Sequence, residues 1–205
     1  MTSRRDLGLM FDFAGVLGLP QPASALEQMA TLADMPVDLF ESHYWSHRRA
    51  YDLGMSDGDY WRDVLASEPS KQVIDQLVRI DVESWLPLND KVVQTARDYA
   101  DEGAEIVVLS NAPDVIARRV EALPELGFVT KFYFSCDIEW AKPDRQAFEL
   151  AKTERAHCVF VDDRSENVDA ANAIGLDAVL FVDEADMRAR LETLCRRTQD
   201  RYPRV

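Results

Sequence analysis

Four short groups of polar residues follow apolar runs in this sequence, and together they carry the residue types of phosphate chemistry. The groups are Asp12, Ser110-Asn111, Lys142-Pro143 and Asp162-Asp163. A lone carboxylate can act as a nucleophile, hydroxyl and amide groups can hold phosphate oxygens, and a lysine offsets negative charge. Adjacent carboxylates suit Mg²⁺, which binds one or two carboxylates together with substrate phosphate oxygens. The groups therefore predict phosphoryl transfer through an aspartyl intermediate, if the fold brings them together.

Each group also has a simpler explanation when it is taken alone. Ser110 or Asn111 could cap a helix that Pro113 begins. Lys142 could be a solvated surface lysine, and the two adjacent aspartates could form a turn that ends in a helix cap. The combination favours chemistry, because the simpler explanation needs four coincidences at one edge of a sheet.

Residues 9–17, Leu-Met-Phe-Asp-Phe-Ala-Gly-Val-Leu, show how the first group is positioned. A short apolar run that ends at a turn signal predicts a strand buried on both faces, as in a parallel sheet. Asp12 then lies at the carboxyl end of the strand, where open α/β sheets bind their ligands. Gly15 lets the chain turn sharply and lets backbone N–H groups approach a phosphate. This stretch alone fits two interpretations equally well: a reactive carboxylate beside a phosphate-binding turn, or a strand that simply ends in a solvated aspartate.

Strands and helices alternate in the second part of the chain. Further strands are expected at residues 106–109, 132–134, 159–161 and 178–182, with helices at 89–103, 113–123, 143–151 and 168–174 between them. A last helix from about residue 187 is followed by a basic end, residues 196–205, which we expect to fray. This alternation predicts an α/β fold with a Rossmann-like parallel sheet and right-handed crossovers. Such a sheet would bring all four polar groups to one edge.

Residues 23–86 contain helical patterns only. Four short helices are expected at about residues 26–33, 39–53, 56–65 and 70–78, with Ser56 and Ser70 as caps of the last two. An all-helical insertion after the first strand predicts a separate lobe. We therefore expect a Rossmann-like core of residues 1–18 and 87–205 and an inserted α-helical cap of residues 19–86.

Composition limits the class of partner. A formal net charge of −14 argues against nucleic acid and against an anionic membrane surface. No signal-peptide pattern is present, and no apolar run approaches the roughly 20 residues of a membrane span, so we expect a soluble cytoplasmic protein. Three widely spaced cysteines, Cys136, Cys158 and Cys195, favour buried free thiols over disulfides.

The motifs resemble those of the haloacid dehalogenase-like (HAD) hydrolase superfamily. They read Asp12-Phe-Ala-Gly-Val, Val108-Leu-Ser110-Asn, Lys142-Pro-Asp and Val161-Asp162-Asp163-x-x-x-Asn167. Their order and approximate spacing match over essentially the whole chain. The helical insertion is similar to the small α-helical cap of β-phosphoglucomutase-like and epoxide-hydrolase-N-domain-like phosphatases. Each motif is weak alone, and four in order are strong.

The resemblance implies a catalytic role for each group. Asp12 would be the nucleophile, and Lys142 would offset charge on the nucleophile and the phosphate. Ser110 would hold the phosphoryl oxygens with help from the backbone N–H of Asn111. These roles imply a small phosphorylated molecule as substrate.

The resemblance also implies a Mg²⁺ site. Its ligands would be Asp12, the backbone carbonyl of Ala14, Asp162 and Asp163. Asn167 would support the loop that carries the two adjacent aspartates.

One position departs from the family pattern. Phosphatases of this kind usually carry a second aspartate two residues after the nucleophile, where it protonates the leaving group and then activates water. This chain has Ala14 there. Loss of a general acid and base costs about 10²- to 10⁴-fold in rate, least for acyl and aryl phosphates.

Relatives suggest three interpretations of Ala14. Phosphonatases have alanine here and use a lysine from the cap, for which Lys71 is the one candidate. Dehalogenases tolerate a non-acidic residue and need no metal, but they lack the acidic pair. The third interpretation is a phosphatase-like protein that is slow, that takes an acid from its cap, or that has become a non-catalytic binder.

The second expected cap helix, His43-Tyr-Trp-Ser-His47-Arg48-Arg49, offers substitutes for the missing acid. His43 and His47 are four residues apart and share one helix face. That face could close over the crevice, with His47 as acid and Arg48 on the far end of the substrate. The alternative is a surface or packing role for both histidines.

Two further groups in the sequence have open roles. Trp45, Trp61 and Trp85 are expected in cap packing rather than on a substrate. Arg145 could steer phosphate or be a surface charge.

The sequence thus predicts a Mg²⁺-dependent HAD-type phosphohydrolase that acts on a small soluble phosphate ester through a phospho-Asp12 intermediate. The alternative is a catalytically impaired HAD-like protein kept for ligand or protein binding, and Ala14 favours that alternative. Phosphonatase-like and dehalogenase-like hydrolysis are lesser alternatives.

Overall fold

A five-stranded parallel sheet forms the centre of the molecule in the computed structural model, which describes the backbone of residues 4–201 and side chains as far as residue 195. The strand order is β3-β2-β1-β4-β5, and every neighbouring pair is parallel. The strands are β1 (Leu7–Phe11), β2 (Glu105–Ser110), β3 (Lys131–Phe134), β4 (His157–Asp162) and β5 (Asp177–Leu180). The sheet confirms the predicted Rossmann-like α/β class.

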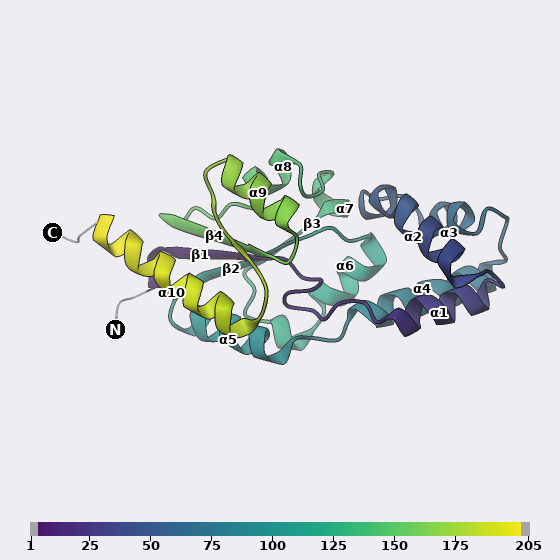
Figure 1. The fold of residues 1–205 in the computed structure, drawn as a ribbon, viewed down its shortest axis with the longest axis horizontal. Coiled ribbons are helices and arrows are strands. Elements are labelled where there is room, and N and C mark those ends of the chain that lie inside the picture. Colours follow the sequence, from purple (N-terminus) through teal and green to yellow (C-terminus); the bar gives the residue numbers. More distant parts are fainter. Residues whose placement is uncertain (1–3, 202–205) are drawn as a thin grey trace.

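Helices cover both faces of this sheet (Figure 1). One face packs against α5 (Asp90–Asp101), α6 (Asp114–Glu121) and α10 (Glu184–Arg201), and the other against α8 (Arg145–Ala151) and α9 (Ser165–Ala173). The 3₁₀ turns η1 (Arg4–Asp6) and η2 (Pro124–Leu126) and the short helix α7 (Ser135–Ile138) complete this part.

The alternation of side chains along β1 explains the two hydrophobic layers. Leu9 and Phe11 belong to the cluster on the α5 side, whereas Met10 between them belongs to the cluster on the α8 side. All five residues of the strand are buried. A continuous apolar run is what a strand covered on both faces requires.

Four inserted helices follow β1 and extend from the carboxyl end of the sheet (Figure 1). They are α1 (Ala23–Leu32), α2 (Val37–Asp52), α3 (Asp57–Leu65) and α4 (Lys71–Trp85). These inserted helices, α1–α4, pack around a hydrophobic cluster of their own, in which the rings of Tyr51 and Tyr60 stack with centroids 4.0 Å apart. Ser56 and Ser70 cap α3 and α4 as predicted, since each hydroxyl accepts a backbone N–H three residues ahead.

Several local predictions were wrong or need adjustment. Pro143 does not begin a helix, since α8 starts at Arg145, two residues later. The Lys142–Pro143 peptide is cis. β5 ends at Leu180, two residues before its predicted end. The predicted frayed end is helical as far as Arg201, and residues 202–205 lie outside the described residues.

None of the three cysteines is part of a disulfide, and Cys158 is buried. Cys136 and Cys195 are half-buried.

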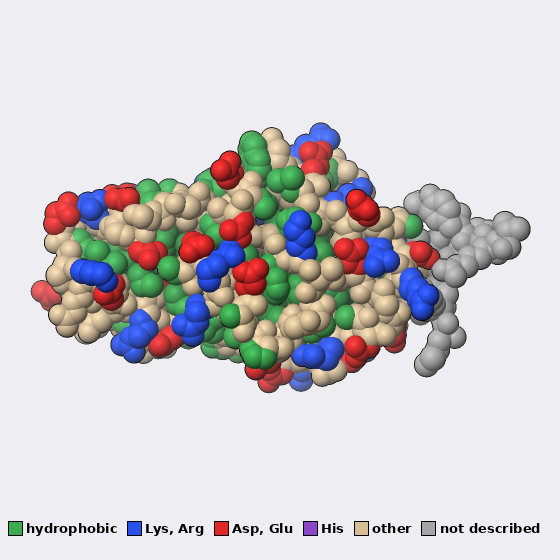
Figure 2. Space-filling view, turned by 180° about the vertical axis from the view of Figure 1, so that it is seen from behind, with side chains coloured by type: hydrophobic (Ala, Val, Ile, Leu, Met, Phe, Trp, Pro, Cys, Tyr) green, Lys and Arg blue, Asp and Glu red, His purple; other side chains and the backbone are tan. Residues whose placement is uncertain are grey.

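Exposed charges of both signs are interspersed among the described residues on the face shown in Figure 2. Neither sign forms a continuous field over that face. None of the helices described here combines the length and the apolar character that crossing a membrane requires.

Candidate active site

The carboxyl ends of three neighbouring strands bring the predicted residues together. Asp12 directly follows β1, Ser110 is the last residue of β2, and Asp162 is the last residue of β4. These strands are adjacent and parallel, so their ends share one edge of the sheet. A pocket of about 820 Å³ opens at this edge, and its lining comes from the strand ends and from the inserted helices.

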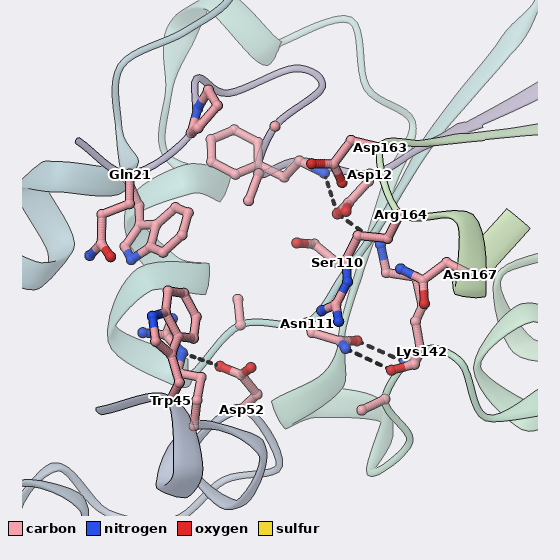
Figure 3. Close-up of a pocket in the computed structure, with 18 of the residues that line it drawn as sticks. Asp12, Gln21, Trp45, Asp52, Ser110, Asn111, Lys142, Asp163, Arg164 and Asn167 are labelled. Atoms are coloured by element: carbon pink, nitrogen blue, oxygen red, sulfur yellow. Dashed lines mark hydrogen bonds and ion pairs between the residues drawn. The ribbon is translucent and has the colours of Figure 1, made fainter. Parts of the chain in front are cut away.

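The pocket has two walls (Figure 3). One wall carries the predicted catalytic and metal-site residues, and the other carries residues from the inserted helices and the loop before them. The first wall includes Asp12, Ala14, Gly15, Ser110, Asn111, Lys142, Asp163, Arg164 and Asn167, and the second includes Gln21, Glu41, Trp45, Arg48, Arg49, Asp52 and Trp85.

Lys142 joins two carboxylates at the base of the first wall. Its Nζ lies 2.8 Å from Oδ1 of Asp12 and 2.7 Å from Oδ2 of Asp162. All three side chains are buried. The ammonium group compensates both buried carboxylates, so removal of Lys142 would leave two buried negative charges unpaired.

Electrostatics at this unit favour a further cation. Burial raises the pKa of Asp12 to about 7, Lys142 opposes the rise, and Asp162 and Asp163 add to it. Burial and the neighbouring Asp162 also raise the pKa of Asp163. Burial alone would lower the pKa of Lys142, but the two carboxylates outweigh it and raise that pKa. Three carboxylates thus face one ammonium, and the local charge is negative.

Asp162 is held firmly in place. Its Oδ1 accepts the backbone N–H of Arg164 at 2.8 Å, and the side-chain amide of Asn167 donates to both carboxylate oxygens at 3.0 Å. With Lys142 on Oδ2, both oxygens of Asp162 are engaged. Asn167 therefore supports this loop, as the resemblance implied.

Asn111 fixes the backbone that carries Lys142. Its side-chain amide donates to the carbonyl of Lys142 at 2.9 Å, and the N–H of Lys142 donates to Oδ1 of Asn111 at 2.8 Å. Ser110, beside it, is buried and lines the pocket. Neither residue caps a helix, which is the simpler role that the sequence left open.

Gly15 permits the approach of Asp163. The glycine has φ +81°, and a Cβ at this position would lie 2.3 Å from Oδ2 of Asp163. One carboxylate oxygen from each of Asp12, Asp162 and Asp163 can lie within 4.8 Å of the others, which suits a hard divalent cation. Gly15 is needed for its close contact with this carboxylate cluster.

A second cluster of possible metal ligands lies elsewhere on the core, at Asp114, Cys136 and Asp137. Arg118 already occupies it, because its guanidinium contacts Asp114 at 3.3 Å and Asp137 at 2.5 Å. This cluster is an arginine site.

Arg48 forms the buried centre of the second wall. Its Nε lies 2.8 Å from Oδ1 of Asp52, and its Nη1 lies 3.4 Å from Oδ2 of Asp81. The hydroxyl of Tyr44 donates to Asp81 at 2.6 Å, and the indole N–H of Trp85 donates to the same carboxylate at 3.1 Å. The guanidinium of Arg48 is thus present at the pocket, as predicted, and already neutralised.

The histidines of α2 lie elsewhere. Nδ1 of His43 is 2.8 Å from the carbonyl of Val64, and Nδ1 of His47 is 4.0 Å from a carboxylate oxygen of Asp63. Neither belongs to the pocket lining. The geometry therefore gives His47 no contact with a phosphate held beside Asp12.

Two other candidate cations also lie away from the lining. Lys71 is exposed and paired with Asp75 at 2.7 Å, and Arg145 is exposed and paired with Glu149 at 2.6 Å.

The three tryptophans were expected to pack within the inserted helices. Trp61 is fully buried there, whereas Trp45 and Trp85 line the pocket.

Asp52 also lines the pocket, which the sequence analysis did not predict. The spacing could have indicated it, because Asp52 lies four residues after Arg48 and hence on the same face of the helix.

Two contacts join α2 to the loops of the first wall. Oγ of Ser135 donates to the carbonyl of Asp52 at 2.5 Å and accepts the N–H of Ala112 at 3.0 Å. Nη2 of Arg49 lies 2.7 Å from Asp144, two residues beyond Lys142. The inserted helices are therefore anchored beside the loops that carry Asn111 and Lys142.

Comparison with known proteins agrees with this geometry. A family model described as haloacid dehalogenase-like hydrolase matches residues 8–175. No curated protein matches the sequence significantly.

Solved structures share the fold at low identity. HAD family enzyme BT-2542 from Bacteroides thetaiotaomicron, solved with magnesium and inorganic phosphate, gives a TM-score of 0.67 at 18% identity, over 84% of this chain and 92% of that chain. A HAD phosphatase from Thermococcus onnurineus gives a TM-score of 0.61 at 16% identity, over 85% of this chain and 86% of that chain. A dehalogenase gives a TM-score of 0.60 at 16% identity, over 83% of this chain and 82% of that chain.

These likenesses support the fold alone, since neighbours of one fold include both a phosphatase and a dehalogenase. The family match covers most of the chain and coincides with the four motifs at the sheet edge. The chain belongs to the haloacid dehalogenase-like hydrolase family.

Proposed function

We propose that this protein is a Mg²⁺-dependent phosphohydrolase that acts on a small phosphate ester through a phospho-Asp12 intermediate. The observation that carries the proposal is the ion pair of Lys142 with Asp12, at 2.8 Å, beside Asp163 in the wall of a pocket. A buried carboxylate next to a fixed ammonium, in a cavity large enough for a substrate, is the arrangement that nucleophilic catalysis on a phosphate needs.

The residues divide the chemistry among them. An oxygen of Asp12 attacks the phosphorus atom, the bond to the leaving oxygen breaks, and water then hydrolyses the phosphoaspartate. Lys142 lowers the electrostatic cost of bringing a phosphate dianion to the carboxylate. The hydroxyl of Ser110 and the backbone N–H of Asn111 orient the phosphoryl oxygens.

The donor set fits Mg²⁺. Three carboxylates, Asp12, Asp162 and Asp163, surround one ammonium, and their oxygens are the hard ligands that this cation prefers. Asp12, Asp163 and the carbonyl of Ala14 would hold the ion, and Asp162 would support it. When bound, the ion supplies positive charge that attracts the phosphate and offsets the excess of carboxylates.

The inserted helices are proposed as the cap of this site, with residues 1–18 and 87–205 as the core and 19–86 as the cap. Their contacts through Ser135 and Arg49 support this division, because both join α2 to the loops that hold catalytic residues. A cap in this position would exclude water from the phosphate and select the rest of the substrate.

Ala14 supports a second candidate function. The chain has no carboxylate two residues after Asp12, so the site could bind a phosphorylated ligand without turning it over. The rival is a catalytically impaired member of the family, kept for ligand or protein binding.

A phosphatase screen separates the two functions. Wild type, Asp12→Asn, Ala14→Asp and the control Asp101→Asn, an exposed aspartate at the end of α5, are assayed with Mg²⁺ on phosphate monoesters and acetyl phosphate. Activity that Asp12→Asn abolishes and Asp101→Asn retains supports the enzyme. A silent wild type with an active Ala14→Asp supports the impaired binder, and silence of both wild type and Ala14→Asp contradicts the phosphohydrolase.

A further inference from the structure

The leaving group of the substrate would meet a pocket in which no uncommitted acid lies close to Ala14. Among the described residues of the lining, three carboxylates outside the metal cluster are available: Glu41, Asp52 and Glu166. Asp52 is held by Arg48 at 2.8 Å, and Glu166 is ion-paired with Arg164. Each of these two carboxylates is therefore committed to a guanidinium. Burial raises the pKa of the Asp52 carboxyl in spite of Arg48, but protonation of Asp52 would leave the buried guanidinium of Arg48 with one counter-ion fewer.

Glu41 lies too far along its helix to replace the missing acid. It precedes Asp52 by eleven residues of α2, which is about 16 Å along the axis at 1.5 Å per residue. Asp52 marks the end of α2 at the core, where its carbonyl contacts Ser135. Glu41 is therefore at the far end of the pocket from the phosphate.

Cations in the lining do not supply a proton either. Arginine side chains remain protonated in proteins, so Arg48, Arg49 and Arg164 can donate hydrogen bonds but not a proton. The ammonium of Lys142 donates to Asp12 and Asp162, at 2.8 and 2.7 Å, so it is directed at these two carboxylates and not at a leaving group.

The second wall offers an aromatic surface instead. Trp45 is 46% exposed and lines the pocket. Its ring packs edge-on against the rings of Tyr44 and Trp85, with ring centroids 4.9 Å and 6.4 Å apart. Trp85 is itself fixed by its hydrogen bond to buried Asp81. In Figure 3, Trp45 lies across the pocket from Ser110 and Asp12. This rigid indole surface suits a planar ring.

The volume leaves room for such a ring. A cavity of about 820 Å³ is within the range that encloses a drug-sized molecule, far beyond the size of a phosphate group. The pocket thus combines an anion site at one wall with an aromatic site at the other.

We infer that the substrate is an aryl phosphate monoester, whose aryloxide leaves without protonation by the enzyme and whose ring packs on Trp45. This inference rests on the proposed function and narrows its substrate class. An alkoxide is a much poorer leaving group without an acid, because alcohols are far less acidic than a phenol.

The two steps balance without a general acid. Asp12 forms a bond to phosphorus while the P–O bond to the ring breaks, and the aryloxide keeps the electron pair and takes a proton from water. Water then attacks the phosphoaspartate, yielding inorganic phosphate and the Asp12 carboxylate. No base at position 14 assists this second step, so the phosphoenzyme accumulates and the first turnover appears as a burst of phenol.

The test is a leaving-group series at constant Mg²⁺. We measure kcat/KM for 4-nitrophenyl, phenyl and ethyl phosphate with wild type and Ala14→Asp. The ratio of phenyl to ethyl phosphate is expected to be at least about 10²-fold larger in wild type, since the variant regains an acid that helps the alkoxide most. Equal ratios in the two proteins overturn the inference.

Wild type alone also tests it, should Ala14→Asp fold poorly. A steep fall in kcat/KM from nitrophenyl through phenyl to ethyl phosphate supports the inference. Ethyl phosphate hydrolysed within about tenfold of phenyl phosphate overturns it and leaves the proposed function standing. No hydrolysis of any of the three esters, together with no Mg²⁺-dependent binding of beryllofluoride, overturns both.

The aromatic wall is tested separately. Trp45→Ala is expected to raise KM for phenyl phosphate about 3- to 10-fold while leaving KM for acetyl phosphate unchanged. Leu39→Ala is the matched control, because Leu39 is on the same helix, 47% exposed and outside the lining. An unchanged KM for phenyl phosphate in Trp45→Ala contradicts ring binding at this wall.

Discussion

The ammonium nitrogen of Lys142 lies 2.8 Å from Oδ1 of Asp12, and both side chains are buried. The same nitrogen lies 2.7 Å from Asp162. Lys142 thus balances two carboxylates that would otherwise repel each other in a medium of low dielectric constant. Lys142 is therefore expected to matter for stability as well as for the proposed chemistry.

Substitution of Lys142 is expected to destabilise the protein, whereas substitution of Asp12 is not. Lys142→Ala leaves two buried carboxylates uncompensated and is expected to lower the free energy of unfolding by about 3–5 kcal/mol. Asp12→Asn removes repulsion from Asp162 and Asp163 and is expected to unfold at an equal or higher denaturant concentration than wild type. Denaturant unfolding without divalent cations measures both, and similar losses in the two variants contradict this account.

Gly15 is predicted to serve the metal site specifically. Gly15→Ala forces a Cβ to within 2.3 Å of Asp163 and is expected to weaken Mg²⁺ binding at least about tenfold. Gly175→Ala is the control, because Gly175 has a similar φ of +82° but no atom within 4 Å of its would-be Cβ. Both should lose about 1–2 kcal/mol of stability through backbone strain.

Calorimetric titration of Mg²⁺ distinguishes the two glycine variants. Equal Mg²⁺ affinity in Gly15→Ala and Gly175→Ala would show that the approach of Asp163 is not needed for the metal.

Asp81 is predicted to hold the second wall together. It is fully buried and accepts from Tyr44, Trp85 and Arg48, so Asp81→Ala strands several buried donors and one cation. We expect a loss of about 3–5 kcal/mol in unfolding free energy. Asp75→Ala on the same helix removes an exposed pair with Lys71 and should cost under about 1 kcal/mol. Comparable losses of unfolding free energy in Asp81→Ala and Asp75→Ala would contradict the proposed role of Asp81.

His157 is predicted to make stability depend on pH. Burial lowers the pKa of His157, and Asp177 at 3.6 Å opposes this only in part. The folded state therefore binds the proton less readily than the unfolded chain, whose histidine titrates near about 6.5. The stabilisation is complete above that pH and is lost as the pH falls below it.

Unfolding free energies between pH 7 and pH 5 check this prediction. The decline towards acid should be shallower in His157→Gln than in wild type, and parallel declines would contradict it.

The parallel sheet explains why most of the first wall was predictable. Asp12, Ser110 and Asp162 each end a run of buried apolar residues, and parallel strands bring such ends to one edge whatever their separation in sequence. Lys142 follows no strand directly, so only the family motif predicted that it would lie at this edge. The cis peptide after it could not be foreseen from periodicity.

The second wall was less predictable for a geometric reason. Each step along a helix turns a side chain by about 100°, so Arg48 faces the pocket while His47, one residue earlier, faces Asp63. Periodicity gives the apolar face of α2, but the part of its polar face that reaches the substrate depends on how the inserted helices dock. Trp45 and Asp52 therefore emerged only from the structure.

The most direct measurement is the location of the phosphoryl group after reaction. Wild type and Asp12→Asn are mixed with radiolabelled acetyl phosphate and Mg²⁺, quenched in acid and digested, and the labelled peptide is sequenced by mass spectrometry. Label on Asp12 in wild type, absent from Asp12→Asn, is the predicted result. Hydrolysis that persists in Asp12→Asn, or label on any other residue, would contradict a nucleophilic Asp12.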